Sequence, residues 1–324
     1  MIIFAGKLYS LKLSIIIPIY NESANINLLY ERLVKVCNQL TEDREFIFVN
    51  DGSKDDSLQR IKLLHQQDSS VKYIDFSRNF GHQIAVTAGL DQCSGDAVVI
   101  IDADLQDPPE LILEMYGKWQ HENFQVVYAK RRKRVGESFL KLWTAKMFYR
   151  ILGSITSISI PVDTGDFRLI DKKIVSYLKK MPEQHKFLRG QISWIGFNQT
   201  YIEYDRDERH GGATAYTYRK MLRFALDGIT SFSDFPLKFA SFVGFAVSGF
   251  AFLMILATIY QRFFGDNYQS GWASMMISVL FIGGIQLIGI GIMGEYMSRM
   301  SSNVRNRPLY IINESNVHSS EKHS

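Results

Sequence analysis

The chain has 324 residues, of which 22% are charged and 46% hydrophobic, and its formal net charge is +4. These values exclude a collagen, a disordered tail and a small disulfide scaffold, and they favour no nucleic-acid partner. The cysteines Cys37 and Cys93 lie far apart and form no CxxC pair, so we expect reduced thiols in the core. Lys7 and Lys12 interrupt the apolar N-terminal residues, so no signal peptide is expected.

The mean hydropathy of −0.06 is that of a soluble protein, but hydrophobic residues concentrate near the C-terminus. Between Phe239 and Gly294 the only charged residues are Arg262 and Asp266. About 20 apolar residues in a helix cross a bilayer core, and both uncharged stretches are longer than that. We therefore predict a transmembrane hairpin with helices at 236–264 and 272–296 and a loop at 265–271. The alternative is a buried helix pair in a soluble domain.

Basic residues predict how this hairpin is oriented. The flanks of the hairpin are richer in Lys and Arg than the polar connecting stretch at 261–271, whose only basic residue is Arg262. By the positive-inside rule, both ends lie in the cytoplasm. We expect a cytoplasmic catalytic domain at 1–215, an amphipathic helix on the membrane surface at 216–235, and a cytoplasmic tail at 297–324.

The first 130 residues predict alternating strands and helices. Apolar runs predict strands at Leu13–Ile19, Glu45–Val49, Val71–Phe76 and Ala97–Ile101. Helical spacing occurs in the segments between these strands, and Pro108 lies near the start of a fourth helix that runs through Trp119. Strands that alternate with helices of 10–15 residues are typical of an α/β fold with a mostly parallel sheet.

Acidic residues follow three of the four predicted strands. Glu22 follows the first strand, Asp51 the second, and Asp102 and Asp104 the fourth. In parallel sheets the ligand site lies at the carboxyl ends of the strands. One such residue alone could cap a helix, but three acidic loops at one edge predict a metal or sugar-nucleotide site.

The sharpest of these motifs is Asp102-Ala103-Asp104-Leu105-Gln106. Two carboxylates around a small residue after a buried strand can bind a divalent cation such as Mg²⁺, which keeps other positions for a diphosphate. The cation would neutralise the charge of a leaving nucleoside diphosphate.

The chain carries a set of short motifs: PIYNE at 18–22, VNDGS at 49–53, RNFG at 78–81, DADLQDP at 102–108, GDFR at 165–168, FLRG at 187–190, DGITSFS at 227–233 and GEY at 294–296. Together these motifs resemble glycosyltransferase family 2, and more narrowly its polyprenyl-phosphate glycosyltransferases, which include bactoprenol glucosyltransferase and dolichol-phosphate mannose synthase. The resemblance covers nearly all of residues 12–312 and implies a GT-A (Rossmann-like nucleotide-diphospho-sugar transferase) domain followed by two transmembrane helices.

The resemblance also implies roles for individual residues. The donor would be bound by Pro18, Tyr20, Glu22, Asp51, Asp102 and Arg189. Asp102, Asp104 and Gln106 would surround Mg²⁺ or Mn²⁺ and the diphosphate, and Asp166 would be the candidate base beside the sugar, with Asp104 the second catalytic residue. The acceptor phosphate would be held by Arg131, Lys141, Lys146, Arg206 and Arg209.

Some residues depart from the family pattern or have simpler interpretations. Relatives carry a lysine where this chain has Ala215, so Arg206, Arg209 or Lys220 would have to compensate. The basic run from Lys130 to Arg134 is either a solvated loop or, as we favour, a contact to phosphate or anionic lipid. His82, His185 and His210 lack metal-ligand spacing and are expected to be surface or hydrogen-bonding residues.

We predict an inverting glycosyltransferase that moves a hexose, with glucose as our choice, from a UDP-sugar to undecaprenyl phosphate. UDP-N-acetylglucosamine or another sugar nucleotide is the alternative donor, and a non-catalytic membrane scaffold is a remote alternative. A processive polysaccharide synthase would carry QxxRW, whereas Gln191-Ile192-Ser193-Trp194 has no arginine before the tryptophan. The acceptor phosphate is already anionic, so Asp166 is expected to orient groups or stabilise charge at least as much as it takes a proton.

The resemblance extends to partners and location. It implies a multi-pass protein of the bacterial inner membrane, surrounded by membrane lipid and associated as a homo-tetramer. The lipid-linked sugar would pass to a flippase and then to an acceptor glycosyltransferase of the cell envelope.

Overall fold

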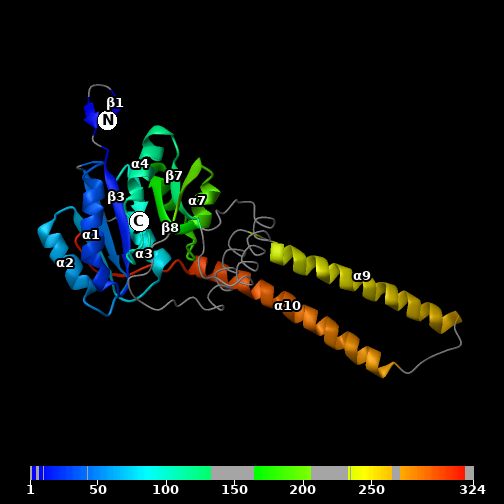
Figure 1. Cartoon of the computed structure of the whole chain (residues 1–324). Coiled ribbons are helices and arrows are strands. Elements are labelled where there is room, and N and C mark those ends of the chain that lie inside the picture. Colours follow the sequence, from blue (N-terminus) through cyan, green and yellow to red (C-terminus); the bar gives the residue numbers. More distant parts are fainter. Residues whose placement is uncertain are drawn as a thin grey trace. The chain divides into compact units, whose positions relative to one another are not determined.

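The computed structural model describes residues 2–4, 7–9, 11–41, 43–132, 164–205, 233, 235–264 and 271–317 (Figure 1). These residues belong to two compact units. Of the described residues, those up to 205 and those from 307 to 317 form the first unit, and the second contains the two long helices.

The first unit is built on a mixed β-sheet. Its described strands follow the order β10-β5-β4-β3-β6-β8-β7-β9. Strands β4, β3, β5 and β6 pair in parallel, whereas β8 runs antiparallel to both β6 and β7. The strand bounds are β3 Leu13–Ile19, β4 Arg44–Asn50, β5 Val71–Phe76, β6 Ala97–Ile100, β7 Val126–Arg131, β8 Thr164–Asp171, β9 Gln199–Tyr204 and β10 Ile312–Ser315. A separate hairpin joins β1 Ile2–Phe4 to β2 Lys7–Tyr9.

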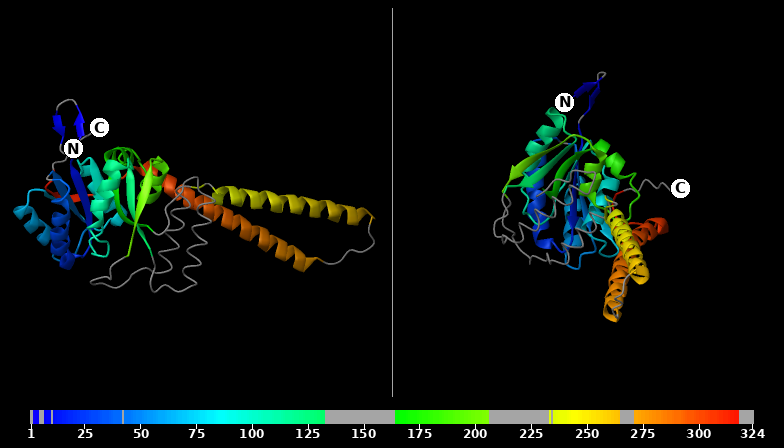
Figure 2. Two further views of the ribbon diagram at one scale, coloured as in Figure 1. Left: turned by 45° about the horizontal axis from the view of Figure 1, so that its top comes forward. Right: turned by 90° about the vertical axis from the view of Figure 1, so that its right-hand side faces the viewer.

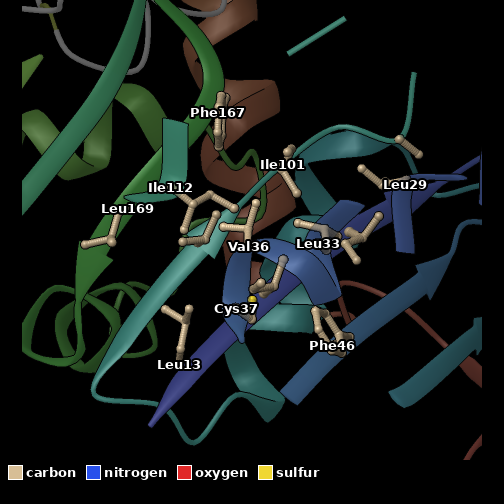
Figure 3. Packing of buried hydrophobic residues seen from close by; sticks show 14 of the residues in the cluster. Leu13, Leu29, Leu33, Val36, Cys37, Phe46, Ile101, Ile112, Phe167 and Leu169 are labelled. Atoms are coloured by element: carbon tan, nitrogen blue, oxygen red, sulfur yellow. The ribbon is translucent and has the colours of Figure 1, made fainter. Parts of the chain in front are cut away.

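Helices cover both faces of this sheet. Helices α1 (Ser23–Cys37), α2 (Ser57–Gln67) and α4 (Leu111–His121) pack into one hydrophobic cluster, which Figure 3 shows from close by. Helices α3 (His82–Gln92), α6 (Lys172–Leu178) and α7 (Leu188–Ile195) contribute to the clusters of the opposite face. Side chains alternate between the faces: Ile15 of β3 joins the first cluster and Ile16 joins the second.

The elements predicted between residues 13 and 121 are present, with ends that differ by a few residues. Apolar runs and the helical spacing of apolar residues predict such strands and helices well, because each of these elements has an apolar pattern within its own sequence. The sequence analysis did not identify β8, β7, β9 or the helices α6 and α7. Strand β8 lies antiparallel between β6 and β7, and both of these strands are distant from it in sequence. No local pattern therefore indicates its place in the sheet.

The segment after the second long helix also differs from expectation. We expected only a tail at 297–324, but residues 312–315 form β10, an edge strand antiparallel to β5. The polar sequence Ile312-Asn313-Glu314-Ser315 carries no strand pattern of its own. Its pairing depends on backbone hydrogen bonds and side-chain contacts with β5, which only the folded sheet provides.

The second unit contains the two long helices α9 (Phe235–Phe264) and α10 (Trp272–Arg305), which contact each other and diverge along their length in the left view of Figure 2. Both helices are long and apolar enough to cross a membrane, over Phe235–Met254 and Ile277–Arg305. Large apolar side chains on both are exposed, among them Phe245 at 80% and Leu287 at 70%. This exposure argues against the alternative of a buried helix pair. Helix α10 continues to Arg305, nine residues beyond the predicted end.

Candidate active site

Polar loops follow the carboxyl ends of β3, β4 and β6, which are neighbours in the sheet. Tyr20 follows β3 and Asp51 follows β4, and the backbone amide of Asp51 donates to the carbonyl of Ile19 (2.8 Å). Asp102 follows β6, which pairs with β3 on its other side. The sheet therefore brings these predicted acidic loops to one edge.

Asp51 is buried, and it binds the loop that precedes α3. Its Oδ1 accepts a hydrogen bond from the amide of Phe80 (2.6 Å) and its Oδ2 one from the amide of Gly81 (2.9 Å). Burial raises the pKa of Asp51, while these two amides oppose that rise. Asp51 thus fixes the Arg78–Gly81 loop at the donor edge, in addition to the nucleoside contact expected from the resemblance.

The next residue, Gly52, packs against the same loop with a left-handed φ of +66°. A Cβ atom there would lie 2.5 Å from the carbonyl carbon of Arg78 and 2.6 Å from the amide nitrogen of Asn79. Both are backbone atoms, so neither can move aside at small cost.

We expect Gly52→Ala to destabilise the fold by about 2 kcal/mol or more, because the loop must shift and φ is strained. Urea unfolding followed by circular dichroism measures this change. Gly117→Ala is the matched control: it lies within α4 with nothing near its Cβ position and should stabilise slightly. Equal stability of the two variants would contradict the assigned close contact.

The Asp102–Asp107 turn carries the predicted metal ligands. The Oδ1 atom of Asp104 accepts from the amide of Gln106 (3.2 Å), and Leu105 between them has a left-handed φ of +59°. The Oδ1 atom of Asp102 is buried and has no hydrogen-bond partner among the described residues. Burial raises the pKa of Asp102 to about 6, so a cation beside this oxygen would stabilise the carboxylate.

The same turn offers carboxylates to a metal ion. Within the described part of the chain, no three His, Cys, Asp or Glu side chains are grouped closely enough to hold a metal ion. Mg²⁺ commonly binds through one or two carboxylates plus the phosphates of its substrate. Asp102 and Asp104, with the buried oxygen of Asp102, fit a divalent cation that is bound together with a diphosphate.

Asp166 of β8 lies at the centre of a charged network. Arg189 of α7 donates from Nε to its Oδ1 (2.9 Å), and the Nε2 atom of His82 lies 3.0 Å from its Oδ2. The guanidinium of Arg168 lies 3.7 Å from Oδ1 and donates to the backbone carbonyl of Gly165 (2.9 Å). Three basic side chains thus surround one carboxylate.

These contacts determine the charge of the network. Burial opposes ionisation of Asp166, but Arg189, His82 and Arg168 hold its pKa well below the usual range. Burial also opposes the charged His82 ring, yet Asp102 and Asp166 outweigh it and raise the pKa of His82 to about 9. At neutral pH the network therefore contains an ionised carboxylate and a protonated imidazole.

Two residues that the sequence analysis did not assign to the site, His82 and Gln83, complete this network. His82 Nε2 lies 3.6 Å from Asp102 and so joins the cation-binding turn to Asp166. Gln83 donates to Asp166 (3.2 Å) and accepts from the amide of Leu188 (3.1 Å). The expectation of a hydrogen-bonding His82 is met, but its partner could not be predicted, because 84 residues separate it from Asp166. The signal available was its place directly after the RNFG motif.

The other residues predicted to bind the donor differ in exposure. Pro18 is buried in β3, where it pairs with Val49, and Tyr20 is 46% exposed. Glu22 turns toward the start of α1 and accepts from the side chain of Asn25 (2.6 Å). Tyr20 is therefore available to a ligand, whereas the carboxylate of Glu22 stabilises the first helical turn.

Of the residues predicted to hold the acceptor phosphate, the structure describes only Arg131. Arg131 lies at the end of β7, and its guanidinium approaches Gly165 of β8. A Cβ atom added to Gly165 would lie 3.3 Å from that guanidinium and 3.7 Å from the carboxylate of Asp107. The hydroxyl of Tyr204 donates to Asp107 and also contacts Arg131. Arg131 thus belongs to a partly buried cluster beside the Asp166 strand. Lys141, Lys146, Arg206, Arg209, Ala215 and the predicted surface helix lie outside the described residues.

Comparisons with known proteins are consistent with this site. Residues 14–178 match the family described as "Glycosyl transferase family 2". The chain is 51% identical over 302 residues to the "Uncharacterized glycosyltransferase YkcC" of Bacillus subtilis, covering 93% of each chain. It is 40% identical over 305 residues to the "Bactoprenol glucosyl transferase" of Shigella phage SfII, covering 94% of this chain and 98% of the other.

Among solved structures, the chain is similar to glucosyl-3-phosphoglycerate synthase from Mycobacterium tuberculosis. The identity is 17%, the TM-score is 0.46, and the match covers 68% of this chain and 76% of that one.

The sheet and its acidic edge have the GT-A architecture of nucleotide-sugar transferases. The chain belongs to glycosyltransferase family 2 and is a glycosyltransferase. The predicted GT-A fold, the enzyme class and the resemblance to polyprenyl-phosphate glycosyltransferases are thereby confirmed.

Proposed function

We propose that this enzyme transfers glucose from UDP-glucose to undecaprenyl phosphate or a related polyprenyl phosphate, with inversion. The observation that carries this proposal is the nearly full-length similarity to bactoprenol glucosyl transferases, together with a GT-A acidic edge and two apolar helices. A lipid acceptor is consistent with those helices, because a polyprenyl chain resides in a bilayer.

In the proposed reaction, an acceptor phosphate oxygen attacks the anomeric carbon and UDP departs. A phosphate is already anionic at neutral pH, so it needs little help from a general base. The low pKa of Asp166 makes this carboxylate a weak base and supports a role in orienting Arg189 and His82 and in stabilising charge. Arg189 and protonated His82 would in turn be held where negative charge develops on the diphosphate.

Asp102, Asp104 and Gln106 would hold Mg²⁺ or Mn²⁺ at the diphosphate. When bound, this cation supplies positive charge that stabilises the leaving UDP. The carboxylate of Asp104 accepts a hydrogen bond from the backbone amide of Gln106, which stabilises the turn. The carboxylates of Asp102 and Asp104 therefore stay near the end of β6.

For Asp104→Asn we expect the metal concentration for half-maximal turnover to rise about 10-fold or more, because one anionic ligand becomes neutral. Isothermal calorimetry with Mn²⁺ and UDP provides a second readout that needs no turnover. The control is Asp43→Asn, a change of an exposed residue just before β4, at the edge of the sheet opposite to the one that carries the acidic loops. Unchanged metal dependence in Asp104→Asn would remove this ligand assignment.

We further propose the arrangement in the membrane. Residues 1–215 would be cytoplasmic, 216–235 would lie on the membrane surface, and 236–264 and 272–296 would cross the bacterial inner membrane. The loop 265–271 would be extracytoplasmic, and the residues from 297 would return to the cytoplasm. Arg219, Lys220, Arg223, Lys238, Arg299, Arg305 and Arg307 at the flanks support this orientation. A homo-tetramer, a flippase and an acceptor glycosyltransferase are the proposed partners.

The decisive experiment incubates the purified full chain with labelled UDP-sugars, Mg²⁺ and undecaprenyl phosphate in detergent. Extraction of the lipid phase and chromatography detect a lipid-linked sugar. Label from UDP-glucose is the expected result. Label only from UDP-N-acetylglucosamine would overturn the choice of glucose, and no labelled lipid from any donor would overturn the proposed function.

A further inference from the structure

Residues 307–317, here named the C-terminal segment, lie outside every predicted site. They nevertheless pack against β5, the strand that leads to the Arg78–Gly81 loop bound by Asp51. Ile312 pairs with Phe76 and Glu314 with Asp75 in the ladder between β10 and β5. The amide of Ser77 donates to the carbonyl of Ile311 (3.0 Å), which extends this pairing toward the Arg78–Gly81 loop. The segment therefore supports the backbone that precedes the amides bound by Asp51.

A first line of contacts is polar. Asp75 is buried; its Oδ2 accepts from the side-chain amide of Asn313 (2.9 Å) and its Oδ1 from that of Asn50 (2.7 Å). An ionised carboxylate can only accept, so each amide must turn its nitrogen toward Asp75. Asn313 therefore orients the carboxylate of Asp75, and this carboxylate in turn orients Asn50. Asn50 directly precedes Asp51 in the chain.

A second line of contacts is aromatic. Tyr310 stacks on Phe76 with ring centroids 5.1 Å apart, and Phe76 meets Phe80 edge-on at 5.6 Å. The amide of Phe80 donates to Asp51 (2.6 Å). The hydroxyl of Tyr310 also donates to Asp91 of α3 (3.0 Å), which holds the ring in place. Both lines start in the C-terminal segment and end at Asp51.

We propose that the C-terminal segment is a positioning element of the donor site, in which Asn313 and Tyr310 hold Asp51 and its loop in the geometry that receives the nucleoside. This inference rests on the proposed function, since the donor role of Asp51 is part of it. The two lines do not include the Asp166 network. Their loss should therefore weaken donor binding and leave the turnover of bound donor nearly unchanged.

The first test replaces Asn313 with aspartate, which keeps the side-chain shape and turns an oxygen toward Asp75 in place of the donating nitrogen. The matched control is Asn316→Asp, the same change in the same segment. Asn316 accepts from the amide of Tyr73 (2.6 Å) and lies 3.0 Å from the ring of His65, near the start of β5 and away from Asp51.

In the full chain we expect Asn313→Asp to raise the Kd for UDP and the KM for the sugar nucleotide about fivefold, through loss of one partly buried hydrogen bond to Asp75, with little change in kcat. Asn316→Asp should lower thermal stability but leave the Kd unchanged. Equal Kd values in the wild type and in both variants would overturn the positioning role, as would equal increases in both variants.

Hydrogen exchange gives a readout that needs no ligand. The amides of Phe80 and Gly81, which bind Asp51, should exchange faster in Asn313→Asp than in the wild type or in Asn316→Asp. If the wild type binds no sugar nucleotide but exchange responds in this way, the coupling stands and the proposed function fails. Unchanged exchange in Asn313→Asp would overturn the coupling itself.

A second pair of variants tests the aromatic line independently. Tyr310→Phe keeps the ring on Phe76, whereas Tyr310→Ala removes it. We expect the UDP Kd of Tyr310→Phe to stay near that of the wild type and that of Tyr310→Ala to rise. Equal Kd values for both variants would overturn a role for the stacked ring.

Discussion

Replacing Asp166 with asparagine is expected to lower kcat at least about 100-fold, because the charge that organises the network is lost. The variant keeps the shape of the side chain but leaves Arg189, His82 and Arg168 around a neutral amide. Without the anion these cations repel one another, so the positions proposed for Arg189 and His82 at the diphosphate would no longer be fixed. Steady-state turnover with UDP-glucose and polyprenyl phosphate measures the change.

The control for this variant is Asp96→Asn. Asp96 pairs with Lys172 (3.4 Å) and accepts from the amide of Lys12 (3.1 Å), at the amino end of the strands and outside the active-site network. It should retain kcat. Binding of UDP to Asp166→Asn, together with an unchanged circular dichroism spectrum, would establish that the site still forms. A kcat within threefold of the wild type would contradict the proposed role of the carboxylate.

The sequence was sufficient for the parallel half of the fold and for the acidic edge. Strands β3 and β6 are apolar runs, and the acidic motifs directly follow β4 and β6, so chain order alone places them at carboxyl ends. Local patterns of this kind also predicted the two apolar helices, since length and lack of charge suffice for that prediction.

The partners of Asp166 could not be predicted in this way. His82 and Gln83 come from the first turn of α3, Asp166 from β8 and Arg189 from α7. Their contacts depend on the antiparallel entry of β8 beside β6, and no local pattern encodes that register. The same reason applies to β10, which pairs with a strand more than 230 residues earlier in the chain.

Glu45 is expected to be the carboxylate on which stability depends most. It is 1% exposed at the start of β4 and joins three segments of the fold. Its Oε1 accepts from the hydroxyl of Ser14 (2.6 Å) and the amide of Ser94 (2.7 Å), and its Oε2 accepts from Lys72. Burial opposes its ionisation, but Lys72, Ser14 and Ser94 outweigh this and lower its pKa to about 2.

We expect Glu45→Ala to cost about 3 kcal/mol or more, because it leaves Lys72 without this carboxylate and the buried hydroxyl proton of Ser14 without its acceptor. Urea unfolding of the full chain in detergent measures this loss.

Glu314→Gln is the control, because the carboxylate of Glu314 pairs with Lys62 at the surface and is 44% exposed. A salt bridge in water contributes little, so this variant should unfold like the wild type. A loss of stability in Glu314→Gln as large as in Glu45→Ala would contradict the special role of Glu45.

The pH dependence of stability provides a second test of Glu45. Its pKa is about 2 in the folded state against 4.5 in the unfolded chain, so the unfolded state binds the proton more readily. The stabilisation is fully present above pH 4.5 and is lost as the pH falls from 4.5 to 2. In Glu45→Gln this part of the acid-induced loss should disappear, because no proton is taken up at that position. The free energy of unfolding of wild type and variant should therefore converge on acidification, and parallel curves would show that another carboxylate controls acid stability.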